Sequence, residues 1–272
     1  MEGELSVVAL VCRTSDRAPQ GAAAAETLAH EIARRAGVPA RIVGSAEAAR
    51  DGQWSDDLRE GRGCLLEAGG QVSDALRAGL VPVLTAADCS ICMTTLREVA
   101  RERPGTVVLW LDAHADFHSP QSTESGYLGG MCLAAACGVW EAGLGSADPF
   151  AAGAVVMAGV RDVDAGELPA LDQHGVVRAS DTDEVLEQVS DRDVFIHLDL
   201  DVLDPDVLPG ASFPSPGGLD GDDLLGLLDA VVEESASIVG IEITGLGTPE
   251  YAAIVADGVA ALLGLGMDAA AE

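Results

Sequence analysis

The chain has 272 residues, which is enough for one large domain with a substantial core. Fifteen basic residues against 45 acidic ones give a formal net charge of −30, which argues against nucleic acid or an anionic membrane surface as a partner. Every basic residue is Arg, and the absence of Lys excludes Schiff-base catalysis and a P-loop lysine. Because 48% of the residues are hydrophobic but only 3% aromatic, the core must consist mainly of Ala, Val, Leu and Ile.

No export or membrane segment is expected. The segment Met1–Arg13 carries Glu2 and Glu4 and only a short apolar run, unlike a signal peptide. No uninterrupted apolar stretch is long enough to span a membrane. The six cysteines have no paired spacing, so we expect all of them except Cys89 to be buried free thiols in a reducing cytoplasm.

Short apolar, β-branched runs alternate with longer Ala- and Leu-rich segments along the whole chain. The predicted strands are, in chain order, Leu5–Cys12, Ala40–Val43, Val81–Leu84, Val107–Leu111, Ala154–Gly159, Val176–Arg178, Val194–Leu200 and Ile238–Thr244. The predicted helices are Ala22–Ala36, Asp56–Ala78, Ile91–Arg103, Leu128–Ala142, Gly221–Glu234 and Pro249–Leu263. This alternation predicts one three-layer αβα domain over residues 1–272, with a mostly parallel sheet of roughly eight strands.

Two acidic motifs follow apolar strands, at the sheet edge where parallel sheets bind ligands. They are Asp112-Ala113-His114-Ala115-Asp116 and Asp199-Leu200-Asp201-Val202-Leu203-Asp204-Pro205. Alternate residues of an extended chain point the same way, so Asp112, His114 and Asp116 share one face, as do Asp199 and Asp201. Either motif alone is equally consistent with a solvated turn. Together they bring four carboxylates and an imidazole to one edge, which favours two bridged octahedral cations such as Mn(II).

The two motifs and their spacing resemble the arginase/agmatinase (ureohydrolase) family, binuclear manganese hydrolases of guanidino groups with a single three-layer α/β domain. The resemblance implies two Mn²⁺ per chain, with Asp112 and Asp199 bridging the ions. His114 and Asp201 would complete one ion's shell and Asp116 the other's. It also implies a mechanism in which a metal-bridging hydroxide attacks the guanidino carbon, while Asp116 orients the hydroxide and accepts its proton.

The resemblance further implies a substrate that is a small guanidino amino acid. Asp164, with Glu167, matches the stretch that holds the α-amino group in arginases. Thr123 and Ser125 match contacts to the α-carboxylate, and His118 stands where arginases carry an Asn with the same role. These matches favour an amino acid over agmatine, which lacks a carboxylate, and the family is consistent with a homo-oligomer.

Three positions depart from the family pattern, and the first concerns a metal ligand. The family's Gly-Gly-Asp-His-Ser motif is Ala86-Ala87-Asp88-Cys89-Ser90 here, so Cys89 stands at the position of a ligand His. A thiolate ligand is one interpretation, although sulfur favours softer ions than imidazole does. A buried Cys that leaves one coordination position to water is another, and a nucleophilic Cys89 is the third and weakest.

The other two departures concern the substrate. The His that relays protons to the leaving amine is replaced by Gly129, and His118 or His197 is a candidate substitute. In the last strand, one alignment gives Glu242 a structural role and places Gly245 at the position of the carboxylate that pairs with the guanidinium. A shifted alignment makes Glu242 itself that carboxylate.

These departures together favour a substrate other than ordinary arginine. An N-hydroxyguanidine is much less basic than a guanidinium and has less need of a paired carboxylate. The expected reaction is therefore hydrolysis of Nω-hydroxy-L-arginine to hydroxyurea and L-ornithine, as in a branch of the family that serves antibiotic biosynthesis. The alternatives are an ordinary arginase- or agmatinase-type ureohydrolase and a catalytically idle metal-binding homologue. Retention of Asp116 and Asp164 argues against the idle protein.

Overall fold

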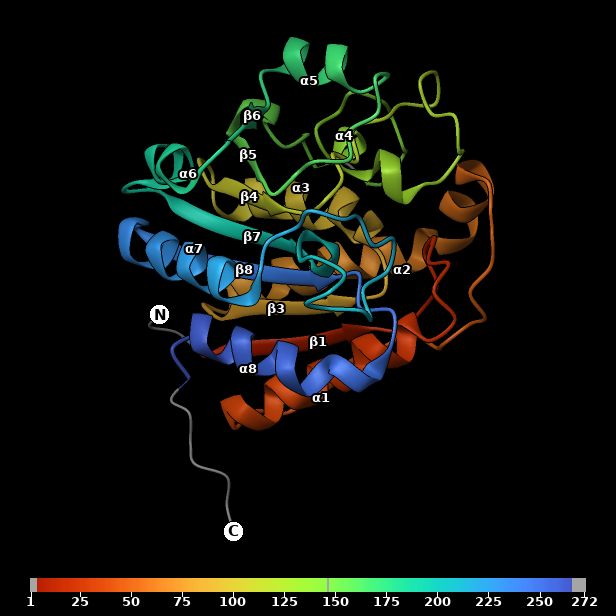
Figure 1. Cartoon of the computed structure of the whole chain (residues 1–272). Coiled ribbons are helices and arrows are strands. Elements are labelled where there is room, and N and C mark those ends of the chain that lie inside the picture. The colour runs from red at the N-terminus through yellow and green to blue at the C-terminus, as the bar shows by residue number, and fades with distance from the viewer. Residues whose placement is uncertain (1–3, 146, 266–272) are drawn as a thin grey trace.

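Eight parallel strands form one sheet in the computed structural model, which describes residues 4–145 and 147–265 (Figure 1). The strands are β1 (Leu5–Leu10), β2 (Ala40–Val43), β3 (Val81–Ala86), β4 (Val107–Leu111), β5 (Val155–Ala158), β6 (Val177–Arg178), β7 (Asp193–Asp199) and β8 (Ser237–Thr244). Their order across the sheet is β2-β1-β3-β8-β7-β4-β5-β6. The bounds 1–272 remain a prediction, because residues 1–3, 146 and 266–272 lie outside the described residues.

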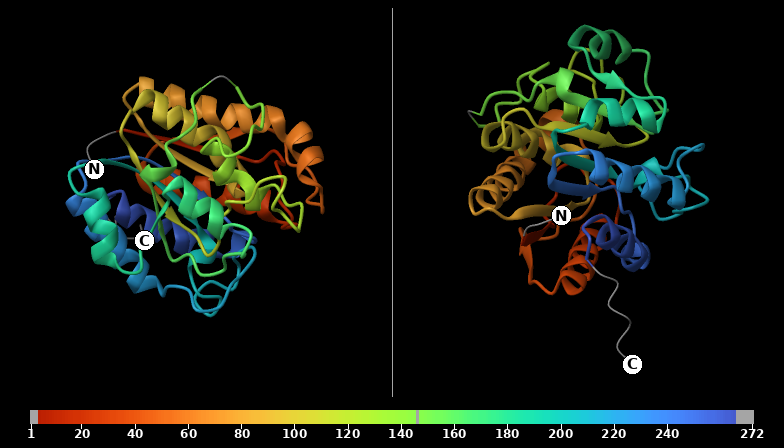
Figure 2. Two further views of the ribbon diagram at one scale, coloured as in Figure 1. Left: turned by 90° about the horizontal axis from the view of Figure 1, so that it is seen from above. Right: turned by 90° about the vertical axis from the view of Figure 1, so that its left-hand side faces the viewer.

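Helices cover both faces of the sheet, as Figures 1 and 2 show. The helices are α1 (Gly21–Ala36), α2 (Trp54–Arg77), α3 (Cys92–Glu102), α4 (Cys132–Ala136), α5 (Leu168–His174), α6 (Thr182–Val189), α7 (Gly221–Glu234) and α8 (Ala252–Leu262). One apolar core lies beneath α1, α6, α7 and α8, and the other beneath α2, α3 and α4. The predicted three-layer α/β fold is confirmed. None of the helices in the described part of the chain combines the length and apolarity needed to cross a membrane.

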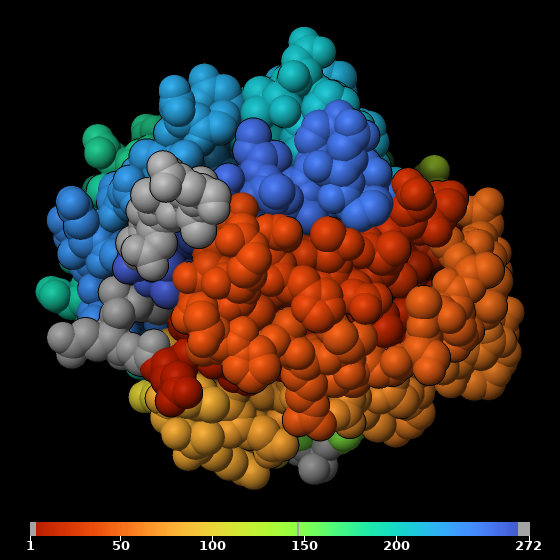
Figure 3. Space-filling view, turned by 90° about the horizontal axis from the view of Figure 1, so that it is seen from below, coloured from red at the N-terminus to blue at the C-terminus, as the bar shows by residue number. Residues whose placement is uncertain are grey.

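Helix α1 shows how the sequence specifies one of these layers. Leu28 and Ile32 are fully buried on its apolar face, against the sheet and the neighbouring α8. The helix ends at Gly37, whose φ of 67° is the left-handed conformation that glycine adopts most readily. Figure 3 shows α1 in orange-red beside the blue C-terminal segment on the outer surface of this layer.

The helical content between β4 and β7 differs from the prediction. The segment predicted as one helix over Leu128–Ala142 is a 3₁₀ turn at Gly129–Met131 followed by the short α4, which ends before Gly138. Two short helices, α5 and α6, were not predicted. The capping residue of α6 was a usable signal, because the Asp181 side chain accepts a hydrogen bond from Glu184 N.

A disulfide joins the end of β1 to α2. Cys12 and Cys64 are bonded, with their Cα atoms 6.0 Å apart. The expectation of free thiols is therefore wrong for this pair and right for Cys92, Cys132 and Cys137. Sequence spacing did not reveal the pair because the two residues are 52 positions apart and are brought together only by packing of α2 on β1.

We expect the unfolded, unreduced protein to titrate with four thiols per chain. In a loop-entropy treatment, a bond across 52 residues stabilises the fold by about 4 kcal/mol. Urea denaturation of a Cys12→Ser/Cys64→Ser variant should show a loss of that order, and reductant should lower the wild type to the same level. Cys137→Ser is the control and should leave stability nearly unchanged. Six titrating thiols in protein purified without reductant would contradict the pairing.

Candidate active site

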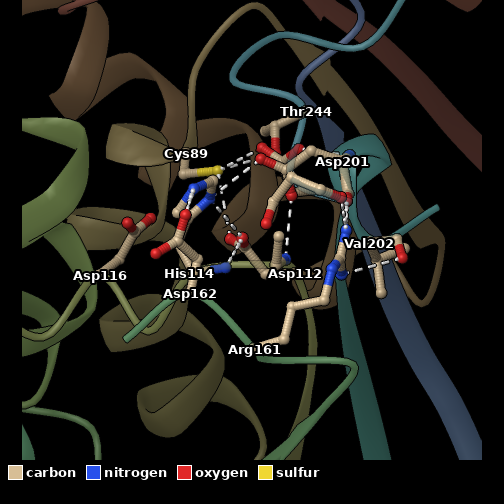
Figure 4. A network of polar contacts seen from close by, with 12 residues as sticks. Cys89, Asp112, His114, Asp116, Arg161, Asp162, Asp201, Val202 and Thr244 are labelled. Carbon is tan, nitrogen blue, oxygen red and sulfur yellow. Dashed lines mark hydrogen bonds and ion pairs between the residues drawn. The ribbon is translucent and has the colours of Figure 1, made fainter. Parts of the chain in front are cut away.

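One cavity of about 270 Å³ lies at the carboxyl ends of the central strands. All six predicted metal ligands line it: Cys89, Asp112, His114, Asp116, Asp199 and Asp201. Five of these surround one space in Figure 4, where Asp199 is not labelled. The two acidic motifs meet because β4 and β7 are hydrogen-bonded neighbours in the sheet, so their carboxyl ends share one edge.

Backbone amides and an imidazole hold the acids of the two motifs together. Asp112 Oδ1 accepts a hydrogen bond from His114 N at 2.6 Å, and Asp201 Oδ1 accepts one from Ala113 N at 2.9 Å. The other Asp201 oxygen lies 3.0 Å from His114 Nδ1. The end of β4 and the turn after β7 are thus cross-linked before any ion binds, which preorganises the donor set.

Cys89 lies among the carboxylates, where the family pattern places a ligand. Its Sγ is 2.8 Å from Asp199 Oδ2 and 3.0 Å from Thr244 Oγ1. Burial, and then the charges of Asp199 and Asp112, raise the pKa of the Cys89 thiol well above its usual value. A free nucleophilic thiolate is therefore disfavoured, whereas a cation at this position would stabilise the thiolate as a ligand.

Asp116 is held in an uncommon backbone conformation. Its φ is 49°, in the left-handed region that residues other than glycine seldom adopt. Its carbonyl oxygen accepts hydrogen bonds from Leu133 N at 3.1 Å and Ala134 N at 3.3 Å. The start of α4 therefore stabilises a strained residue whose carboxylate lines the cavity.

The acids carry more negative charge than the neighbouring side chains neutralise. Burial, followed by repulsion from a neighbouring acid, raises the pKa of Asp199 to about 7 and that of Asp201 to about 6. Burial lowers the pKa of His114, but its contacts with Asp112 and Asp201 outweigh this and raise it to about 12. The site thus combines buried carboxylate oxygens, an imidazole and a sulfur, and it lacks positive charge. Such a set of donors fits divalent cations.

We expect the metal-free protein to become less stable as the pH rises from about 4 to 7. The unfolded carboxyls titrate near 3.8, whereas Asp199 and Asp201 keep their protons to higher pH in the folded state. Folding is therefore opposed once these groups must ionise, by a few kcal/mol at about 1.4 kcal/mol per pKa unit. Urea denaturation with EDTA at pH 5 and pH 7.5 measures the difference. Mn²⁺ should stabilise the protein more at pH 7.5, and an equal effect at both pH values would contradict the charge argument.

Four of the six predicted substrate contacts line the same cavity. Glu167 Oε1 accepts a hydrogen bond from Phe117 N at 2.7 Å and Oε2 accepts one from Asp164 N at 2.9 Å, so it joins the loops after β4 and β5. His118 Nε2 lies 3.0 Å from Asp164 Oδ2. Asp164, Glu167 and His118 line the cavity together with Ser125. They form an acidic, hydrogen-bonding end suited to an ammonium group.

Thr123 is placed differently from the other predicted substrate contacts. It is not among the residues that line the cavity, and its Oγ1 accepts a hydrogen bond from Gly126 N at 3.1 Å. This bond shapes the loop that carries Ser125.

Arg161 fixes the rim of the cavity between the loops after β5 and β7. Its guanidinium donates to the carbonyl oxygens of Asp201 at 2.8 Å and Val202 at 3.2 Å, as Figure 4 shows. It also donates to Gly159 O at 3.0 Å and Ser215 O at 2.6 Å. All these acceptors are backbone carbonyls, which identifies Arg161 as a support for the rim.

The comparisons with known proteins identify the family. The model of the Arginase family matches residues 22–261. The chain belongs to the arginase family. The N(omega)-hydroxy-L-arginine amidinohydrolase of Streptomyces lavendulae is 33% identical over 255 residues, which is 92% of each protein. The arginase of Brevibacillus brevis is 34% identical over 167 residues, 54% of this chain and 55% of that protein.

Solved structures of the family have the same fold. Arginase from Bacillus caldovelox matches with a TM-score of 0.83 at 22% identity, over 97% of this chain and 99% of that one. Proclavaminate amidino hydrolase from Streptomyces clavuligerus matches with a TM-score of 0.68 at 20% identity, over 96% and 90% of the two chains. As a member of the arginase family, the chain is a metal-dependent hydrolase whose substrate is a small guanidino compound.

Within this arginase-family site, Glu242 occupies a position that excludes substrate contact. It is fully buried and does not line the cavity. Its Oε1 is 2.7 Å from His197 Nδ1, and its Oε2 accepts a hydrogen bond from Thr95 Oγ1 at 2.6 Å. The prediction that Glu242 binds substrate is wrong, because β8 places it one pleat deeper in the sheet than Thr244, which contacts Asp199. The alignment that gives Glu242 a structural role is the one that fits.

Tyr127 occupies the space that a side chain at the position of the arginase shuttle His would need. A Cβ added at Gly129 would lie 2.6 Å from Tyr127 Cε1 and 2.8 Å from its hydroxyl oxygen. The Tyr127 hydroxyl donates to Asp88 Oδ2, and Arg17 lies over the ring at 4.4 Å from its centroid. The sequence indicated the departure at Gly129 but not that Tyr127 fills the space a side chain would need there.

The resemblance to the family gives Gly245 the position of the carboxylate that pairs with the guanidinium. A Cβ added there would lie 2.0 Å from Asp199 Oδ1, and the residue has a φ of 78°. The close approach of this backbone to a predicted metal ligand requires glycine. No side chain fits at this position while Asp199 keeps its place.

Proposed function

We propose that this arginase-family enzyme uses two Mn²⁺ ions per chain to hydrolyse Nω-hydroxy-L-arginine to hydroxyurea and L-ornithine. The observation that carries the proposal is the contact of Gly245 with Asp199, which leaves no space for a carboxylate partner of a guanidinium. An N-hydroxyguanidine is much less basic and can bind nearly neutral. The relative from Streptomyces lavendulae, named for action on hydroxyarginine, supports the same substrate. The proposed setting is antibiotic biosynthesis; the cytoplasmic location expected from the sequence conflicts with the Cys12–Cys64 disulfide.

The donor set fits manganese. Four of the six predicted ligands are aspartates, whose hard oxygens suit Mn²⁺, and His114 adds an imidazole. Cys89 is the softest donor, and we propose that it binds as a thiolate on the side of Asp199, from which its Sγ is 2.8 Å away. When bound, the two ions lower the pKa of a shared water, so that a nucleophile forms at neutral pH.

The remaining chemistry belongs to side chains of this chain. Asp164 and Glu167 form the acidic end of the cavity and would hold the α-amino group, with His118 and Ser125 beside the α-carboxylate. The substrate would then extend with its hydroxyguanidine at the aspartates. Asp116 would orient the attacking water and take its proton. That proton balances the reaction when it is passed to the nitrogen of the departing ornithine.

A parallel assay of hydroxyarginine, arginine and agmatine with Mn²⁺-loaded protein tests the proposal. We expect kcat/KM for hydroxyarginine to exceed that for arginine by at least about 100-fold, equivalent to about 2.7 kcal/mol of transition-state discrimination. The same assay with Cys89→His tests the thiolate. Unaltered metal content and unaltered substrate preference in that variant would remove Cys89 from the account.

An ordinary ureohydrolase is the second candidate. It is favoured by the 34% identity to the arginase of Brevibacillus brevis over about half of the chain. Equal or higher activity on arginine or agmatine would establish this candidate and refute the first.

A further inference from the structure

A second row of polar side chains lies one pleat below the metal-binding row. Trp110, His197 and Glu242 occupy directly paired positions on β4, β7 and β8. The row above consists of Asp112, Asp199 and Thr244, each two residues further along the same chain segment, so the two rows share one face of the sheet. All three side chains are fully buried. A buried imidazole therefore lies directly beneath the predicted ligands Asp112 and Asp199.

The hydrogen bonds of this row determine which nitrogen of His197 carries the proton. Its Nδ1 is 2.7 Å from Glu242 Oε1, and Thr95 Oγ1 donates to the other oxygen of that carboxylate at 2.6 Å. The indole of Trp110 stacks on the imidazole with centroids 3.6 Å apart and planes 2° from parallel. Because the Glu242 carboxylate can only accept a hydrogen bond, Nδ1 carries the proton and donates it. Nε2 then presents its lone pair. The stacked ring is held in this orientation.

Nε2 of His197 is buried and has no hydrogen-bond partner among the described residues. A ring nitrogen of His197, Cys89 Sγ and a carboxylate oxygen of Asp112 lie within 4.8 Å of one another. A buried acceptor without a partner costs about 1–3 kcal/mol, so its retention requires a reason. Beside a thiol and a carboxylate, a cation satisfies all three groups at once.

We propose that His197 binds, through Nε2, the same metal ion as Cys89. A histidine that binds a metal commonly donates its other N–H to a carboxylate, and Glu242 supplies that carboxylate here. The imidazole lost at position 89 is thus replaced from below the site by β7 rather than from the loop after β3. This inference rests on the proposed two-metal function.

The test counts imidazoles bound to the metal rather than turnover. X-ray absorption at the manganese edge of the wild-type protein should show two imidazoles per pair of ions, from His114 and His197. His197→Gln should show one, and equilibrium dialysis should find one of two Mn²⁺ sites weakened by at least 100-fold. Glu242→Gln should keep both imidazoles but weaken Mn²⁺ binding by about 10-fold. His114→Gln is the matched reference, and the exposed His30→Gln is the control for unchanged binding.

One imidazole per ion pair in the wild type would overturn the inference, as would unchanged Mn²⁺ affinity in His197→Gln. The wild-type count decides the question if circular dichroism shows that His197→Gln does not fold. The inference and the proposed function fail separately. Two imidazoles without turnover of hydroxyarginine would refute the function and keep the ligand. Turnover with one imidazole would do the reverse.

Discussion

Replacing Asp199 by Asn is expected to lower kcat/KM by at least about 10³-fold, equivalent to about 4 kcal/mol of transition-state stabilisation. Asp199 is a predicted bridging ligand, and its carboxylate also contacts Cys89 Sγ, Thr244 Oγ1 and Asp201 N. An amide of the same shape removes the negative charge needed to hold two cations together. We expect at most one Mn²⁺ per chain in this variant.

Metal content by atomic absorption and turnover of hydroxyarginine measure the two effects. Asp222→Asn, in the exposed first turn of α7, is the matched control and should change neither. The variant should also lose much of the pH dependence of metal-free stability described above, because the raised pKa of Asp199 contributes to it. Two tightly bound Mn²⁺ ions and near wild-type turnover in Asp199→Asn would refute the bridging role.

Gly245→Glu is expected to lower kcat/KM by at least about 100-fold on every guanidino substrate, even though it restores the acidic residue that arginases carry. Its Cβ would approach Asp199 Oδ1 to 2.0 Å, so the aspartate must move or the loop must open. Gly245→Ala should show much of the same loss, because the clash begins at the Cβ.

Gly217→Ala separates the clash from backbone strain. Gly217 has a φ of 83°, similar to that of Gly245, but an added Cβ would meet no atom within 4 Å. We expect it to cost about 1–2 kcal/mol of stability and to leave metal content unchanged. Steady-state kinetics, metal analysis and urea denaturation compare the three variants. A gain of arginine hydrolysis in Gly245→Glu would show that Asp199 yields easily and would remove the basis of the proposed substrate.

Local patterns in the sequence were sufficient for the fold and for the position of the aspartates. Apolar β-branched runs alternating with amphipathic helices predict a parallel sheet, and α1 ends at Gly37 as its pattern indicates. Asp112 and Asp201 follow buried strands, so the common edge of a parallel sheet brings them together without further information. The resemblance to the arginase family added the substrate class and the proposal that the ions are manganese.

Short helices and distant pairs were not predictable in this way. Helix α4 has only 5 residues, too few for a periodic pattern, and its first turn is fixed by hydrogen bonds to the carbonyl of Asp116. The Cys12–Cys64 bond joins residues separated by 52 positions. Neither feature has a local signal, because packing between distant segments produces both.

The amino-acid sequence by itself determined that this chain is an α/β protein with an acidic metal site of the arginase type. The tertiary structure decided which residues reach that site and which only support it. Glu242 is 147 residues from Thr95 and 45 from His197, yet each of these residues hydrogen-bonds one oxygen of its carboxylate. The carboxylate is therefore not available to the substrate. Gly245 is required by the position of Asp199. Such constraints arise from contacts between side chains on different strands. The distances between those side chains cannot be read from the amino-acid sequence.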